Sequence, residues 1–113
     1  MPGITLAAAK AIKIGKLKAR VSDYIYETYG LAEQASFNTL MAEGMRRLWV
    51  NRQALIQGVH DWVFSVLAEY HAKKDDVNAA TDVAAVAAVS LSLASFDATN
   101  PRVSVKNAAA TRS

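Results

Sequence analysis

The sequence contains no cysteine and only two prolines in 113 residues. The absence of thiols excludes disulfides, thiol nucleophiles and cysteine-bound zinc or iron–sulfur sites, although it identifies no compartment. Hydrophobic residues amount to 52% of the chain and charged residues to 20%. That balance is typical of an ordered chain that buries a core, and it excludes a disordered tail or a collagen-like rod.

Long hydrophobic runs are also missing. The N-terminal region contains five cations between Lys10 and Arg20, where a signal peptide needs an unbroken apolar stretch. Elsewhere every apolar run is far shorter than the ~18 residues that span a bilayer. We therefore expect a soluble protein without an export signal and without contact to a membrane.

The length allows one domain, or a helical body with an appendage. A chain of this size buries only about 60 to 68% of the surface that its unfolded form exposes. A long helical hairpin buries less than a sphere of equal mass. Self-association would bury the surface that a single chain leaves exposed, so we expect a homo-oligomer.

Residues 4–29 have the spacing of an amphipathic helix, because apolar side chains recur every three or four positions. Gly30 follows directly and is typical of a residue that ends a helix in the left-handed conformation. The apolar positions of this helix face are Ala7, Ala11, Ile14, Leu17, Val21, Tyr24 and Ile25.

Residues 31–74 continue the helical period without a proline. We expect one long helix or two helices in series over about 32–73. Gly44 weakens a helix interior by roughly 1 kcal/mol relative to alanine, and a polar stretch follows at residues 51–53, so we predict a break or kink near Asn51. Residues 1–74 are thus expected to form a helical body, an antiparallel helical hairpin or bundle in a mainly α protein.

Residues 75–113 differ in composition, since small residues dominate after Asp76. Thr81 and Asp82 are suited to cap a short helix with a valine-rich inner face. Beyond it, apolar residues alternate with serines, which predicts two short strands. A lone hairpin is marginally stable in water, so we expect a β-like hairpin or an extended arm that docks on a neighbour, with a flexible end at 107–113. The alternating residues are Leu91, Leu93, Phe96, Val103 and Val105.

No motif in the sequence indicates catalysis. His60 and His71, the only histidines, are separated on a helix by ~16 Å, which is too far for one metal ion. The acidic residues between Asp75 and Asp82 lack the glycine and the closing glutamate of a calcium loop. Phosphate-binding loops and nucleophile motifs are absent as well. We therefore expect no enzyme, no metal and no cofactor.

The basic residues before Asp23 oppose the dipole of their own helix, so the stability of that helix does not explain them. Lys13, Lys16 and Arg20 share one face, with Lys10 at its edge. Such a strip fits nucleic acid, an anionic membrane or an acidic protein, and a solvated outer face is the alternative. No aromatic residues are interleaved, which disfavours binding of single strands.

Phe64 points away from the core side of its helix, because two positions after Trp62 turn the helix by ~200°. An apolar ring on an outer face needs a cover, which is either the C-terminal segment or another subunit. We expect the partner-binding surfaces to combine this ring with the basic strip and the C-terminal apolar residues. These candidates are Lys10, Lys13, Lys16, Arg20, Phe64, Leu91, Leu93, Val103 and Val105.

Landmarks along about two thirds of the chain resemble a known group of proteins. The lysine-rich run 10–20, with Tyr24-Ile25, Tyr29-Gly30 and Gln34, resembles a segment of small bacteriophage tail-associated proteins and tail-fibre parts. The stretch from Asn51-Arg52 through Trp62, Glu69-Tyr70, Asp75-Asp76 and residues 79–83 is similar to the helical hairpin that follows there. One departure is Gly30, which stands where that group usually has proline.

The resemblance implies a non-enzymatic virion or tail component that attaches through helix packing, in several copies. Its partners would be further copies and other virion proteins, and its place the virion, with the host cytoplasm during assembly. Two alternatives stay open: a small nucleic-acid-binding helical module that uses the 10–20 face, and a phage-encoded inhibitor of a host protein. Binding to duplex DNA at rising salt tests the first alternative, and a pull-down from host lysate tests the second.

Overall fold

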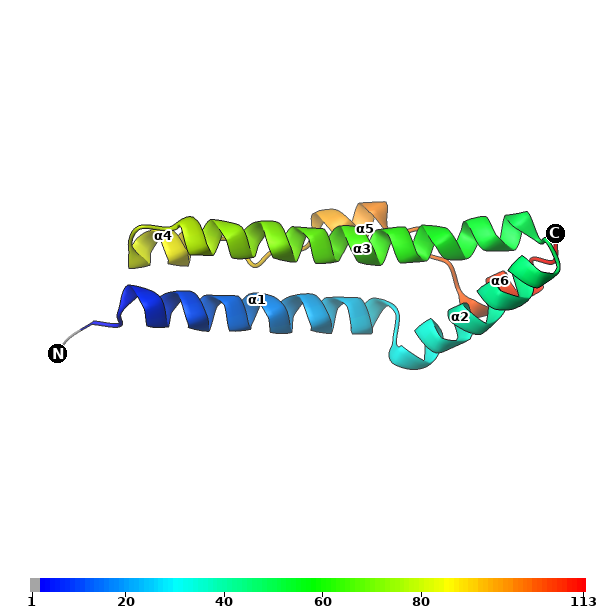
Figure 1. Cartoon of the computed structure of the whole chain (residues 1–113), viewed down its shortest axis with the longest axis horizontal. Coiled ribbons are helices and arrows are strands. Elements are labelled where there is room, and N and C mark those ends of the chain that lie inside the picture. Colours follow the sequence, from blue (N-terminus) through cyan, green and yellow to red (C-terminus); the bar gives the residue numbers. More distant parts are fainter. Residues whose placement is uncertain (1–2) are drawn as a thin grey trace.

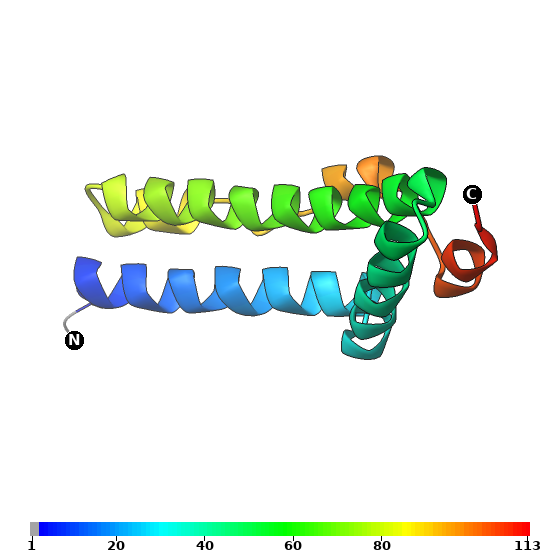
Figure 2. The ribbon, with the colours of Figure 1, turned by 45° about the vertical axis from the view of Figure 1, so that its right-hand side comes forward.

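The structure is a computed structural model that describes residues 3–113, which fold into six helices. The long helices α1 (Leu6–Thr28) and α3 (Val50–Ala79) lie side by side and antiparallel (Figure 1). Helix α2 (Leu31–Arg46) leaves the end of α1 at an angle and packs against α3 (Figure 2). The result is a rod of 64 × 21 × 20 Å. The expectation of a mainly helical bundle is confirmed.

Helix α1 begins at a threonine cap, since the Thr5 hydroxyl accepts the N–H of Ala8 at 3.1 Å. Its apolar stripe is buried from Leu17 to Ile25, whereas Ala7 and Ala11 are exposed. Burial therefore concentrates in the second half of the helix, where the larger side chains lie.

Gly30 does not end α1 in the left-handed conformation, so that prediction is wrong. Its φ is −64°, and it is the cap residue that begins α2. Tyr29 ends α1 instead, in an extended conformation that any residue adopts. The Gly30 N–H is directed to the Glu33 carboxylate at 3.4 Å, so the glycine belongs to the start of the second helix.

The predicted break near Asn51 is confirmed, and it lies at residues 47–49, two to four residues before Asn51. Helix α2 ends at Arg46 and α3 begins at Val50. Between them Leu48 adopts a left-handed conformation with φ 58°, and the Trp49 N–H donates to the Gly44 carbonyl at 2.8 Å. This tight turn folds α2 back onto α3.

The short capped helix predicted after Asp76 is confirmed as α4 (Val83–Ala88). The Asp82 carboxylate accepts the N–H of Ala85 at 2.7 Å. From α4 the chain returns along the whole rod, through α5 (Ser95–Thr99), to α6 (Val105–Ala110) beside the α2–α3 turn (Figure 1).

No strand forms within residues 3–113, so the predicted β-like hairpin is wrong. The alternation of serine with apolar residues has another cause: in the extended stretch before α5, Leu91 and Leu93 pack against the helices while Ser90 and Ser92 stay exposed. Leu93 is 2% exposed and Val103 8% exposed. Backbone groups that a strand would pair are bonded to side chains, since the Lys73 ammonium donates to the carbonyls of Ser90 and Ser92 at 2.7 and 2.9 Å.

Three aromatic side chains of the long helices hold the returning segment in place. The Tyr24 hydroxyl donates to Asp97 Oδ1 and the Tyr29 hydroxyl to Asn100 Oδ1, both at 2.5 Å. The Trp62 indole N–H donates to the Phe96 carbonyl at 2.9 Å. The C-terminal segment is thus part of the main core, which contains residues of α1, α2, α3 and α6 together with Leu93 and Val103.

The end of the chain is fixed rather than flexible, contrary to the prediction for residues 107–113. Residues 105–110 form α6, which is capped by the Ser104 hydroxyl. The backbone N–H groups of Asn51 and Arg52, at the start of α3, donate to the Ser113 carbonyl oxygen at 2.8 and 3.3 Å. A helix N-terminus offers such unpaired N–H groups, and here the chain itself supplies the acceptor.

Candidate interaction surfaces

Two of the predicted basic candidates bind inside the molecule. The Lys10 ammonium donates to the Asn78 carbonyl at 2.7 Å, and that of Lys13 to the Ala87 carbonyl at 3.3 Å. These carbonyls lie in the last turns of α3 and α4. A helix C-terminus carries partial negative charge. Lys10 and Lys13 therefore oppose the dipole of their own helix, α1, but interact favourably with the dipoles of α3 and α4.

The remaining basic residues of α1 are exposed. Lys16 and Arg20 stay on the predicted face, and Lys18 lies apart from them. The Arg20 guanidinium is 5.5 Å from the centre of the Tyr24 ring. The strip available to an anionic partner is therefore smaller than the sequence indicated.

The C-terminal candidates are mostly used within the chain. Leu93 and Val103 are buried in the core, and Leu91 and Val105 are half-buried. Because a buried side chain offers no surface to a neighbour, docking of this segment as a free arm is not what the structure supports.

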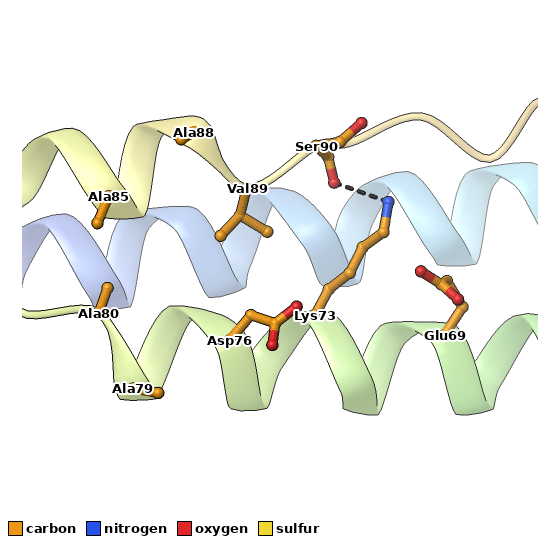
Figure 3. Close-up of a pocket in the computed structure, with 9 residues that line it drawn as sticks. All are labelled: Glu69, Lys73, Asp76, Ala79, Ala80, Ala85, Ala88, Val89 and Ser90. Carbon is orange, nitrogen blue, oxygen red and sulfur yellow. Dashed lines mark hydrogen bonds between the residues drawn. The ribbon is translucent and has the colours of Figure 1, made fainter.

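An open groove of about 500 Å³ lies between α3 and α4 (Figure 3). The Lys73 side chain crosses the groove toward Ser90, and its ammonium donates hydrogen bonds to two carbonyls. The acidic side chains Glu69 and Asp76 lie on the α3 side, and the α4 side presents alanines and Val89. The groove forms because α4 folds back against α3. The Lys73 ammonium stabilises this arrangement through its two hydrogen bonds.

The two histidines lie in different surroundings. The His71 ring packs on that of Tyr70, with centroids 5.2 Å apart, whereas His60 lines a hollow between α2 and α3. Among residues 3–113, no three His, Asp or Glu side chains lie close enough together to hold a metal ion.

Phe64 is 65% exposed, while Trp62 is 3% exposed. The opposite orientations predicted for the two rings are therefore confirmed. Phe64 borders a hollow of about 280 Å³ whose lining includes no residue of the C-terminal segment and no formally charged residue. We call this the Phe64 surface; it consists of Gln34, Phe37 and Asn38 from α2 and Val59, His60, Val63 and Phe64 from α3.

A buried arginine at the other end of α3 was missed in the sequence. Arg52 is 1% exposed. Its guanidinium donates to the Glu43 carboxylate at 2.6 Å and to the carbonyls of Ala109 and Thr111 at 2.7 and 2.9 Å, and it lies 4.6 Å from the Trp49 ring centre. One signal was present: Arg52 lies four and seven positions before Ile56 and Val59, on the buried stripe of α3.

Burial and hydrogen bonding shift the pKa of three side chains. Burial raises the pKa of Tyr24 to about 12, and the hydrogen bond to Asp97 acts in the same direction. Burial likewise raises the pKa of Tyr29. The hydrogen bond from Arg52 lowers the pKa of Glu43. Both tyrosines therefore stay neutral donors at physiological pH, and the glutamate stays an anion.

Comparison with models of known families, with curated proteins and with solved structures finds no match to this chain. No helix within residues 3–113 is both long enough and apolar enough to cross a membrane.

Proposed function

We propose that this protein is a non-enzymatic structural component of a bacteriophage particle, attached to the tail or its fibres through packing of its helices on a neighbouring subunit. The observation that carries the proposal is the Phe64 surface, where a ring that is 65% exposed borders an uncharged hollow. Apolar surface that a folded chain leaves open is typical of sites for protein partners. The bacteriophage setting is supported by the sequence landmarks between residues 10 and 83.

The composition of the Phe64 surface favours a protein partner over other classes. The cores of protein interfaces are depleted of charged residues and enriched in aromatic ones. The exposed Phe64 ring lies beside two amides, an imidazole and the half-buried Val63, whereas Phe37 and Val59, which also line the hollow, are buried in the chain's own core. An aromatic ring also contributes large contact area at little cost in side-chain entropy. The docking residues proposed are thus on α2 and α3, in place of the C-terminal segment.

The basic strip of α1 gives little support to the alternative function of binding nucleic acid. Phosphate binding needs free cations, because affinity comes from the counterions that each contact releases. Lys10 and Lys13 already donate to backbone carbonyls, which leaves Lys16 and Arg20 on that face. An inhibitor of a host protein would use the same Phe64 surface, and capture of a host protein in place of virion proteins would identify it.

The proposal is tested by quantitative mass spectrometry of purified particles of the phage that carries the gene. We expect the protein in a fixed number of copies per particle. Phe64→Glu should be lost from particles while remaining folded in the lysate. Tyr26→Glu is the matched control, because Tyr26 is 49% exposed on α1 and borders no hollow named above. Particles that lack the wild-type protein, although the lysate contains it, would contradict the proposal.

A further inference from the structure

Phe64 lies at the middle of α3, the helix that runs nearly the whole length of the rod (Figure 1). Its neighbours across the hollow, Gln34 and Asn38, come from α2. Residues that carry formal charge make up 20% of the sequence, yet none lines this hollow. The occupant therefore meets apolar side chains, two amides and an imidazole in this hollow, and no formal charge.

The charge of the chain indicates which kind of occupant fits. The net charge is +3. Exposed cations lie elsewhere: on α1, at Arg46 and Arg47 beside the α2–α3 turn, and in the C-terminal segment at Arg102, Lys106 and Arg112. An acidic partner would gain from contact with those cations and would gain nothing from an uncharged hollow. Two copies of a basic chain, in contrast, repel unless they meet where no cation lies. An uncharged surface with a projecting ring thus fits a second surface of the same kind.

The rod as a whole exposes more surface than a compact chain of the same mass. The chain exposes 6975 Å², whereas a compact monomer of 12.2 kDa exposes roughly 6,100 Å². The excess is on the order of 900 Å². A standard stable interface takes about 800 Å² from each partner, so one side-by-side contact removes the excess.

We propose that the occupant of the Phe64 surface is a second copy of this chain, related by a two-fold axis that passes beside Phe64. The proposal rests on the function proposed above and names the first subunit that the chain packs against. In a two-fold pair the same surface is contributed by both copies. Each Phe64 ring then packs into the hollow between α2 and α3 of the other copy, and two rods pair at their midpoints.

Sedimentation of the full chain over a range of concentrations tests this pairing. We expect a species of two chains for the wild type and for Tyr26→Glu. Phe64→Glu should weaken association by about 30-fold or more, as removal of a central aromatic residue does at other interfaces. The two glutamates would also face each other across the axis. Phe64 is largely exposed in the single chain, so circular dichroism should show an unchanged fold.

The absence of cysteine allows a second, independent measurement with one spin label per chain. A label on Asn38→Cys, in the lining of the hollow, should lie close to its counterpart in the second copy. A label on Tyr26→Cys, on α1, should lie farther from its counterpart. Equal distances for the two positions would contradict the proposed axis.

A native mass of one chain at every concentration, or a dimer that Phe64→Glu leaves intact, would overturn the pairing. Neither result would overturn the function proposed above, which depends on the presence of the protein in particles. A monomer that still needs Phe64 to enter particles would assign the hollow to another virion protein.

Discussion

The Arg52 guanidinium joins three segments at one end of the rod. It binds Glu43 of α2, two carbonyls at the end of α6, and the face of Trp49. Arginine suits this position because its planar fork of five donors stays charged when buried. The side chain therefore adds polar contacts to the core packing of Ala108, which holds the six-residue helix α6.

Substitution of this residue gives a direct prediction. Arg52→Ala should lower the free energy of unfolding by about 2 to 4 kcal/mol, because charge-assisted hydrogen bonds are lost and the carbonyls of Ala109 and Thr111 lose their donor. Urea unfolding followed by circular dichroism measures the loss. Arg46→Ala is the control, since Arg46 is largely exposed and lies 3.9 Å from the same glutamate; it should cost less than about 0.5 kcal/mol. Equal effects for both variants would contradict the role of Arg52.

The shifted pKa of Tyr24 predicts a dependence on alkaline pH. Its folded-state pKa is about 12, above the ordinary value of 10.0, so its contribution is complete below pH 10 and is lost as the pH rises toward 12. The difference in unfolding free energy between wild type and Tyr24→Phe should be constant at neutral pH and should shrink over that alkaline window. Urea unfolding at a series of pH values measures it. A difference that stays constant up to pH 12 would show that the phenol is not held neutral.

At the scale of the elements, two glycines within helices should respond differently to substitution by alanine. Gly15 in α1 has open space where a Cβ would lie, whereas a Cβ on Gly44 would lie 3.3 Å from Arg52 Cδ. Gly15→Ala should raise the free energy of unfolding by about 0.5 to 1 kcal/mol through helix propensity. Gly44→Ala should give no gain, since the Arg52 side chain is held by its hydrogen bonds and cannot move aside. Thermal unfolding of the two variants checks the contrast, and a clear gain at Gly44 would contradict the rigidity of this contact.

The lysines of α1 should matter for stability rather than for binding. The double variant Lys10→Ala, Lys13→Ala removes two cations from the C-terminal ends of α3 and α4, and should lower the free energy of unfolding by about 1 kcal/mol at low salt. The double variant Lys16→Ala, Lys18→Ala carries the same change in charge at exposed positions and should have little effect. Thermal unfolding at low and high salt measures both, and the first loss should shrink as salt screens it. Equal losses for the two double variants would contradict the proposed role of Lys10 and Lys13.

The elements that the sequence predicts well are those with a strong helical period. The apolar stripes of α1 and α3, the turn before Asn51 and the Asp82 cap depend on neighbours within a few residues, so periodicity and capping rules apply. The C-terminal segment depends on distant residues. Alternation of serine with leucine has the same appearance in a strand and in an extended segment that packs on helices. The contacts that decide between the two come from distant residues: Lys73 binds Ser90 and Ser92, and three aromatic side chains bind residues 96–100.

At the scale of the whole molecule, the C-terminal segment covers one side of α3 and leaves another side exposed. The C-terminal segment packs against one side, where the Trp62 indole reaches Phe96. Phe64 remains exposed on another side. Helix geometry alone predicted that this ring faces outward, because the angle between positions 62 and 64 is fixed. That the C-terminal segment would leave it uncovered could not be predicted, since the path of that segment is set by long-range contacts.

Small-angle X-ray scattering of the full chain tests most directly whether the molecule completes itself against a second copy at its midpoint. We expect a scattering mass of two chains, with a longest dimension close to the 64 Å of a single rod, because rods that pair side by side hardly lengthen. A mass of one chain at every concentration, or a pair nearly twice as long as one rod, would contradict it.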